Sequence, residues 1–276
     1  MSRDEFIEMM LTAKMQCDLA VALYHGDEAI AELASRVGAR FRTFNCANTA
    51  AAALIFHDHA HLVFCGTNDI SDWAQNINTK LTTIDNFEVH SGFASQAEWM
   101  SREINRSDFY SLVEGKRLYI GGHSAGGAIA ELMPIVSSRM LSSVDGVYTF
   151  GAPKSMARRS AAKYMAMPFK AYGFSMDGDP IPYVPLNLVR MLLGKRTYAH
   201  GSVGLSINDD GLVRSASGTT AVEKTFAVAK SIYLAGLTSL AVFIRQLPSL
   251  MKSHSILRYQ DAIEQRLQES TKENTV

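Results

Sequence analysis

The segment from Arg117 to Leu132, RLYIGGHSAGGAIAEL, places one serine between two groups of small residues. A strand-like apolar run precedes Ser124, and a helix-like, alanine-rich run follows it. Residues 122–126 fit the pattern G-x-S-x-G, in which a serine lies on a sharp turn between a strand and a helix. The residues two positions away must be small, because strand and helix approach closely there. The pattern predicts a nucleophilic serine; the alternative is a serine packed in a glycine-rich loop.

A serine hydroxyl is a weak nucleophile at neutral pH and needs a histidine base oriented by a carboxylate. After a turn of this kind the expected chain order is Ser, then Asp or Glu, then His. Asp177 and Asp179 follow a predicted strand, and His200 and His254 come later. The residues alone leave all four as candidates. Oxyanion donors are expected from the residue after the serine and from a loop after an earlier strand, here the loop that contains Thr67.

Helix-like and strand-like segments alternate along the chain. Helices are predicted over 4–37, 70–77, 95–104 and from 125 onward, and strands over 117–122, 147–153 and 170–176, with two more strands around a His/Asp turn within 49–67. This alternation is typical of an α/β fold with a mainly parallel central sheet and helices on both faces. We expect a single domain over 1–270 and a disordered tail over 271–276.

The composition argues against a nucleic-acid-binding protein and against a disulfide-rich secreted protein. Lys and Arg total 27, as do Asp and Glu, so no net charge favours nucleic acid or an anionic surface. Three cysteines without metal-ligand spacing, Cys17, Cys46 and Cys65, indicate a reducing compartment and no disulfide framework. The N-terminus carries early acidic residues and does not read as a secretory signal. We therefore expect a cytoplasmic protein, or one exported without a cleavable signal peptide.

Five separated motifs give a more specific interpretation. They are HLVFCGTNDISDW (61–73), VHSGF (89–93), GHSAGGAIA (122–130), VYTFGAPKSM (147–156) and GDPIPYVP (178–185). In this order they resemble the class 3 lipase family, the α/β-hydrolases that include fungal triacylglycerol lipases and feruloyl esterases. HSILRY (254–259) resembles the segment around the family's histidine.

The resemblance implies an α/β-hydrolase fold and a serine carboxylester hydrolase, in the first place a lipase that cleaves acylglycerol esters through an acyl-enzyme. It implies Ser124 as nucleophile and His254 as base. It favours Asp179 over Asp177, because Asp179 has the family's prolines three and six positions on. The backbone N–H groups of Thr67 and Ala125 would bind the oxyanion, with the Thr67 hydroxyl as a further donor. It implies no cofactor and no metal.

Other functions stay open at this point. A phospholipase, or a short-chain or feruloyl-type esterase, would use the same residues. A non-catalytic α/β-hydrolase that serves as a binding module would not need them, and covalent labelling of Ser124 by a fluorophosphonate would distinguish it. The chain departs from the family at Cys65, where arginine is usual, and over 211–253, where no counterpart is found. The partners expected are a lipid or other ester substrate and a transient lipid interface, without nucleic acid or a transmembrane segment.

A lid over the acyl pocket is expected within 187–247. In the fungal relatives the lid follows the oxyanion loop, but residues 68–80 are too polar here for an apolar flap. The hypothesis is that 187–193 or 225–247 took this role. Residues 231–244 are uncharged but shorter than the ~20 residues that span a bilayer. A core helix is slightly favoured for them, and a lid or interfacial helix is the alternative.

Five further histidines call for an interpretation. His57, His59 and His61 would share one face of a single strand and could hold a metal, but a turn that separates them is favoured. His90 is predicted to pack in the interior near the serine. His123 is predicted to shape the turn beside Ser124 rather than to act as a base.

Overall fold

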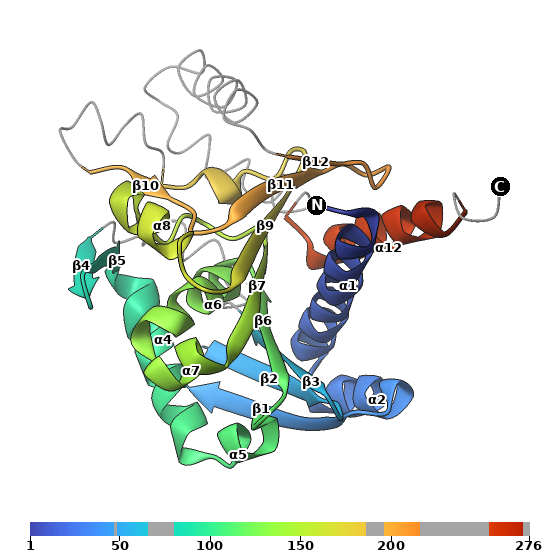
Figure 1. Cartoon of the computed structure of the whole chain (residues 1–276), viewed down its shortest axis with the longest axis horizontal. Coiled ribbons are helices and arrows are strands. Elements are labelled where there is room, and N and C mark those ends of the chain that lie inside the picture. The colour runs from blue at the N-terminus through green and yellow to red at the C-terminus, as the bar shows by residue number, and fades with distance from the viewer. Residues whose placement is uncertain (47–48, 66–79, 186–195, 216–253, 273–276) are drawn as a thin grey trace.

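A computed structural model describes residues 1–46, 49–65, 80–185, 196–215 and 254–272. Within these residues the central feature is an eight-stranded sheet in the order β1-β2-β3-β6-β7-β9-β11-β12 (Figure 1). Its strands are β1 (Arg40–Cys46), β2 (Thr49–Ile55), β3 (His59–Cys65), β6 (Arg117–His123), β7 (Val144–Phe150), β9 (Lys170–Met176), β11 (Val203–Ile207) and β12 (Val213–Ser215).

Strands β3, β6, β7, β9 and β11 run parallel to one another, while β1, β2 and β12 add antiparallel pairings at the two edges. The carboxyl ends of the parallel strands meet at one edge of the sheet. Loops that leave this edge, after β6, β7 and β9, therefore come together in space, which is where sheets of this kind place their ligands.

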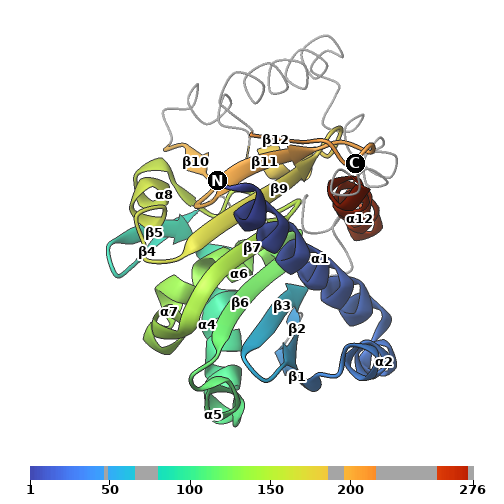
Figure 2. The ribbon, with the colours of Figure 1, turned by 45° about the vertical axis from the view of Figure 1, so that its right-hand side comes forward.

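Helices cover both faces of the sheet, as Figures 1 and 2 show from two directions. One face packs against α4 (Ser91–Arg106), α5 (Phe109–Val113), α6 (Ala125–Val136) and α7 (Ser138–Ser143). The other face packs against α1 (Arg3–His25), α2 (Asp27–Val37) and α12 (Ile256–Lys272). The predicted α/β architecture, mainly parallel and covered on both faces, is confirmed.

Alternate residues of the central strands supply the two cores. Leu118 and Ile120 of β6 pack toward α4 and α6, whereas Tyr119 packs toward α1. Burying one such aliphatic side chain stabilises the fold by about 1.5–3 kcal/mol.

The N-terminal region differs from its prediction in two ways. The helix expected over 4–37 is divided at Gly26, whose φ of 98° suits glycine and ends α1 before α2 begins. Strand β1 was not predicted. In its sequence, RFRTFNC, four of the seven residues are polar and only Phe44 is buried, which is typical of a strand at the sheet edge.

A second, smaller antiparallel sheet lies beside the main one. Within the described part of the chain its order is β10-β8-β5-β4, formed by β10 (Tyr198–Ala199), β8 (Met156–Ala157), β5 (Phe87–His90) and β4 (Leu81–Ile84). Helix α8 (Arg158–Tyr164) and the 3-10 turn Ile181–Tyr183 are the remaining elements of the described ranges.

Several predictions fall on residues outside the described ranges. These are the helix over 70–77, the Thr67 donor and the candidate lid segments 187–193 and 225–247, which include 231–244. Helix α12 continues to Lys272, two residues into the predicted tail, and 273–276 lie outside the description. Among the helices that are described, none has the length and apolar character needed to cross a bilayer.

Candidate active site

Ser124 occupies a strained turn between β6 and α6. Its φ of 58° and ψ of −131° are unusual for a residue with a side chain, and a conformation of this kind costs about 1–3 kcal/mol. A hydrogen bond of 2.9 Å from the Ser124 backbone N–H to the Phe150 carbonyl of β7 holds the turn. The helix therefore starts immediately after the serine, at Ala125.

The glycines on either side make this turn sterically feasible. A Cβ atom on Gly126 would lie 2.1 Å from the Phe64 carbonyl oxygen, and one on Gly122 would lie 2.5 Å from the Gly126 backbone. These neighbours are main-chain atoms that cannot swing aside. The small residues two positions from Ser124 thus serve the close strand–helix approach that the sequence pattern predicts.

His254 and Asp179 form a fully buried pair at the same edge of the sheet. His254 Nδ1 is 2.8 Å from Asp179 Oδ2, and neither side chain is exposed. The other oxygen, Oδ1, accepts the Ile181 backbone N–H at 2.9 Å. A carboxylate only accepts, so the proton of this pair lies on His254 Nδ1, and Nε2 of the neutral ring is left as an acceptor.

Two buried polar atoms at this edge of the sheet are a matching donor and acceptor. Ser124 Oγ and His254 Nε2 are both buried, and neither has a hydrogen-bond partner among the described residues. A hydroxyl can donate one proton, and the bare Nε2 can accept one. A buried polar group without a partner requires an explanation, and a catalytic role is one.

The rival residues have other partners. Asp177 Oδ1 accepts a hydrogen bond from Ser206 Oγ at 3.2 Å. His200 Nε2 lies 2.8 Å from the Pro182 carbonyl, to which it donates, and burial lowers the pKa of His200 to about 4. The carboxylate beside His254 is thus Asp179, whereas His200 has a backbone carbonyl as its partner.

The first turn of α6 contains Ala125, the one of the two predicted oxyanion donors that the structure describes. The backbone N–H groups of Gly127 and Ala128 both donate to the Ser124 carbonyl. Ala125 is the first residue of the helix, where backbone N–H groups and the helix dipole favour negative charge. The second proposed donor, Thr67, lies outside the described residues.

Comparison with known proteins identifies the family of the central part of the chain. The profile of the family "Lipase (class 3)" matches residues 61–189, which include Ser124 and Asp179.

The match places residues 61–189 in the class 3 lipase family.

Solved structures similar to this chain are fungal lipases with the α/β-hydrolase fold. Rhizomucor miehei triacylglyceride lipase aligns with a TM-score of 0.57 and 16% identity over 75% of this chain and 81% of that one. Lipase from Rhizopus microsporus var. chinensis gives 0.56 and 16% over 74% of each chain. Lipase II from Rhizopus niveus gives 0.55 and 18% over 74% of this chain and 81% of that one. No curated protein sequence matches this chain. The fold and the family make the protein a carboxylester hydrolase of the lipase type.

Two residues around the His–Asp pair were not predicted from the sequence of this lipase. Tyr259 of α12 donates to Asp179 Oδ2 at 2.6 Å and accepts the Met176 backbone N–H at 3.0 Å. Gly151, at the carboxyl end of β7, has a φ of 58°, and a Cβ there would lie 2.8 Å from both Asp179 Oδ2 and His254 Cε1. Both residues lie within the sequence motifs, but only folding brings them next to the His254–Asp179 pair.

We predict that Tyr259→Phe lowers kcat about 10-fold, because Asp179 loses one of its donors and holds His254 less well. Burial raises the pKa of Tyr259 well above its usual range, so its hydroxyl remains a donor at every working pH. Steady-state ester hydrolysis measures the effect. The control is Tyr164→Phe, which removes a buried hydroxyl without a partner among the described residues and should leave kcat unchanged. Equal rates in both variants would contradict the prediction.

A second buried carboxyl lies on the nucleophile's helix. Glu131 of α6 is fully buried and accepts from Ser155 Oγ at 2.5 Å and Ser202 Oγ at 3.1 Å. Burial raises the pKa of Glu131 from 4.5 to about 7, against the smaller opposing effect of these hydrogen bonds. The network joins α6 to the loops before β8 and β11.

This raised pKa predicts a pH-dependent stability. The folded state retains the Glu131 proton to higher pH than the unfolded chain does, so the stability is full below pH 4.5 and falls as the pH rises to about 7. The loss should approach about 3 kcal/mol, and Glu131→Gln should remove it. Urea unfolding of both proteins at pH 5 and pH 8 measures the difference. An identical pH response in the two would contradict the prediction.

The histidines His57, His59, His61 and His90 lie in a turn, on a strand or at a helix cap. His57 lies in the turn before β3, while His59 and His61 lie on β3, so the predicted turn separates only the first from the others. No group of three His, Cys, Asp or Glu residues that could hold a metal occurs in the part of the chain that is described. His90 is buried and caps α4 by accepting the Phe93 backbone N–H at 3.4 Å.

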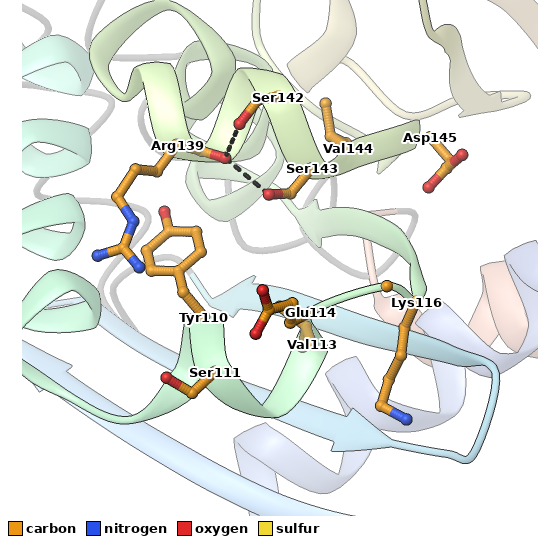
Figure 3. A pocket seen from close by; sticks show the side chains of 11 residues that line it. Tyr110, Ser111, Val113, Glu114, Lys116, Arg139, Ser142, Ser143, Val144 and Asp145 are labelled. Carbon is orange, nitrogen blue, oxygen red and sulfur yellow. Dashed lines mark hydrogen bonds between the residues drawn. The ribbon is translucent and has the colours of Figure 1, made fainter.

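A polar pocket of about 480 Å³ lies between α5 and α7 (Figure 3). Its lining includes Tyr110, Glu114, Lys116 and Arg139, and the Arg139 guanidinium lies 4.1 Å from the centre of the Tyr110 ring. The pocket lies at the amino ends of β6 and β7, whereas Ser124 follows the carboxyl end of β6. It is therefore separate from the Ser124 site.

Proposed function

We propose that this class 3 lipase cleaves acylglycerol esters through an acyl-enzyme on Ser124. The observation that carries the proposal is a combination at one sheet edge: a strained serine, a buried His254–Asp179 pair, and the atoms Ser124 Oγ and His254 Nε2, which have no hydrogen-bond partner among the described residues. A binding module would need none of these features together. Such buried, complementary groups are what a serine esterase requires.

In the first half of the proposed reaction, Ser124 Oγ attacks the ester carbonyl while His254 Nε2 takes its proton. The C–O double bond becomes a single bond, and the carbonyl oxygen carries the negative charge. Asp179 holds the Nδ1–H of the resulting imidazolium. When the tetrahedral intermediate collapses, the leaving alcohol receives the proton from Nε2 and the acyl-enzyme remains.

In the second half, water attacks the acyl-enzyme and gives its proton to His254. Collapse of this intermediate releases the fatty acid and returns the proton to Ser124 Oγ. The backbone N–H groups of Ala125 and Thr67, with the Thr67 hydroxyl, are proposed to hold both oxyanions. Loss of one such donor typically costs about 3–4 kcal/mol of transition-state stabilisation.

The proposals for the substrate class and for the lid are based on similarity to solved fungal lipases. The Rhizomucor miehei relative is described as a triacylglyceride lipase, and a further fungal lipase–inhibitor complex, 15% identical over 74% of this chain with a TM-score of 0.55, is described as a model for interfacial activation. We propose that 187–193 or 225–247 forms the lid of this lipase. Making either segment polar should abolish interfacial activation if that segment is the lid.

Hydrolysis of p-nitrophenyl esters from C2 to C16, with and without lipid micelles, tests the function. A long-chain optimum that rises at the interface, followed by cleavage of emulsified triacylglycerol, supports the proposal. A short-chain optimum without interfacial response would indicate a soluble esterase. Cleavage of phospholipid vesicles but not of triacylglycerol would indicate a phospholipase. No hydrolysis of any ester would leave only a binding role.

A further inference from the structure

His123, the residue before the proposed nucleophile, contacts the proposed base in two ways. Its Nε2 lies 2.7 Å from the backbone carbonyl oxygen of His254. The two imidazole rings also stack, with centroids 4.5 Å apart and an angle of 29° between their planes. His123 is buried, so no solvent competes for these contacts. The residue that the sequence assigned to the shape of the turn therefore touches both the main chain and the ring of His254.

The hydrogen bonds fix the tautomer of His123. A carbonyl only accepts, so Nε2 carries the proton that it donates to His254. On the other side of the ring, Nδ1 lies 3.0 Å from the hydroxyl of Tyr24, near the end of α1. Nδ1 of the neutral ring has no proton, so Tyr24 must donate to it. Burial lowers the pKa of His123 well below its usual range, which agrees with a neutral ring.

The chain of hydrogen bonds extends to a position where this sequence departs from its family. Tyr24 also hydrogen-bonds to Cys65, the last residue of β3. This contact lowers the pKa of Cys65, although burial raises it by more. Cys65 pairs with His123 across the parallel strands β3 and β6. A chain of hydrogen bonds thus runs from Tyr24 through His123 to the His254 carbonyl, and Cys65 contacts its first member.

We propose that His123 is a positioning residue for His254, and that Tyr24 keeps it in the tautomer this role requires. The role rests on the proposed function, in which His254 is the base. His123 itself does not act on the substrate, because both of its ring nitrogens are engaged. The Nε2–H of His123 holds the main chain of His254, and the His123 ring limits the rotation of the His254 ring. Through Tyr24, this arrangement also connects α1 to the active site.

Two substitutions at His123 separate the hydrogen bond from the stacking. His123→Phe keeps an aromatic ring against His254 but has no donor for the His254 carbonyl. His123→Gln loses the ring but can place its amide N–H near the position of Nε2. The matched control is His61→Phe, because His61 is likewise buried on a central strand and bonded to a side chain of α1, at 3.2 Å from Gln16 Nε2. Every variant is compared by thermal unfolding as well.

We expect His123→Phe to lower kcat on a soluble p-nitrophenyl ester about 10- to 100-fold relative to His61→Phe, since small displacements of a catalytic group have effects of this size. KM should change by less than about 2-fold, because the substrate does not touch His123. His123→Gln should recover most of the rate. Tyr24→Phe, the mildest change, should lower kcat about 5-fold. In ¹⁵N-histidine-labelled protein, the Nδ1–H resonance of His254 should shift or broaden in His123→Phe and stay in place in His61→Phe.

The proposal is overturned if His123→Phe and His61→Phe have the same kcat, if His123→Gln is as slow as His123→Phe, or if the loss lies in KM. Should His123→Phe fail to fold, His123→Gln and Tyr24→Phe decide: a Tyr24→Phe rate equal to wild type removes the role of Tyr24. If the wild-type protein cleaves no ester, the proposed function fails. The His254 resonance then still decides the positioning role, because it requires no substrate.

Discussion

Ser124→Ala is expected to lower kcat on a long-chain p-nitrophenyl ester by about 10⁴-fold or more, because no other group can form the acyl-enzyme. The residual rate should come from stabilisation of the transition state by the oxyanion site alone. Initial rates at saturating substrate measure the effect. The control is Ser101→Ala, which truncates a buried serine of α4 and should retain wild-type turnover.

The variant Ser124→Gly tests whether the loss of activity comes from unfolding rather than from loss of the nucleophile. Alanine keeps the strained φ of 58°, whereas glycine adopts it freely. Ser124→Gly should therefore be inactive and about 1 kcal/mol more stable than Ser124→Ala. Turnover by either variant above a few per cent of wild type would show that Ser124 is not the nucleophile.

Gly126→Ala is expected to lower the free energy of unfolding by more than about 3 kcal/mol, the upper range of overpacking effects. The new methyl group would meet the Phe64 carbonyl oxygen at 2.1 Å and the carbonyl carbons of Phe64 and Cys65 at 2.6 and 2.9 Å. Strand β3 or helix α6 would have to move, and Ser124 with it. Urea unfolding measures the stability, and ester hydrolysis the activity.

The matched control for Gly126 is Gly92, since each is the second residue of its helix. A Cβ on Gly92 meets only side-chain atoms of His90, at 3.2 and 3.4 Å, and its φ is ordinary. Gly92→Ala should change stability by less than about 1 kcal/mol, since alanine also favours helix. Equal stability of the two variants would contradict the steric explanation for glycine at position 126.

The nucleophile could be predicted because its constraints are local. Strand, glycines, serine and helix lie within 16 residues of chain, and each is recognisable from its neighbours. Asp179 and His254 come from positions far along the chain, and the residues alone left Asp177 and His200 open. The family resemblance favoured the pair that the folded chain brings to 2.8 Å. The spacing of the prolines after Asp179 was the deciding signal.

Residues that act through long-range contacts could not be predicted. Tyr24, Tyr259 and Gly151 belong to α1, α12 and the loop after β7, and nothing in their local sequence indicates a role at Asp179 or His254. Strand β1 was missed for a related reason, because at the sheet edge half of its residues face solvent and weaken the apolar pattern. The tertiary structure supplies this information by aligning the carboxyl ends of β3, β6, β7 and β9.

The central claim is that Ser124 is an activated nucleophile served by His254. The most direct measurement is labelling of the wild-type protein with a fluorophosphonate, followed by mass spectrometry of its peptides, beside His254→Ala. We predict one phosphonate adduct, on Ser124, formed rapidly in wild type and at least about 10³-fold more slowly in His254→Ala. An adduct on another serine, no adduct at all, or an equal labelling rate in the two proteins would contradict the account.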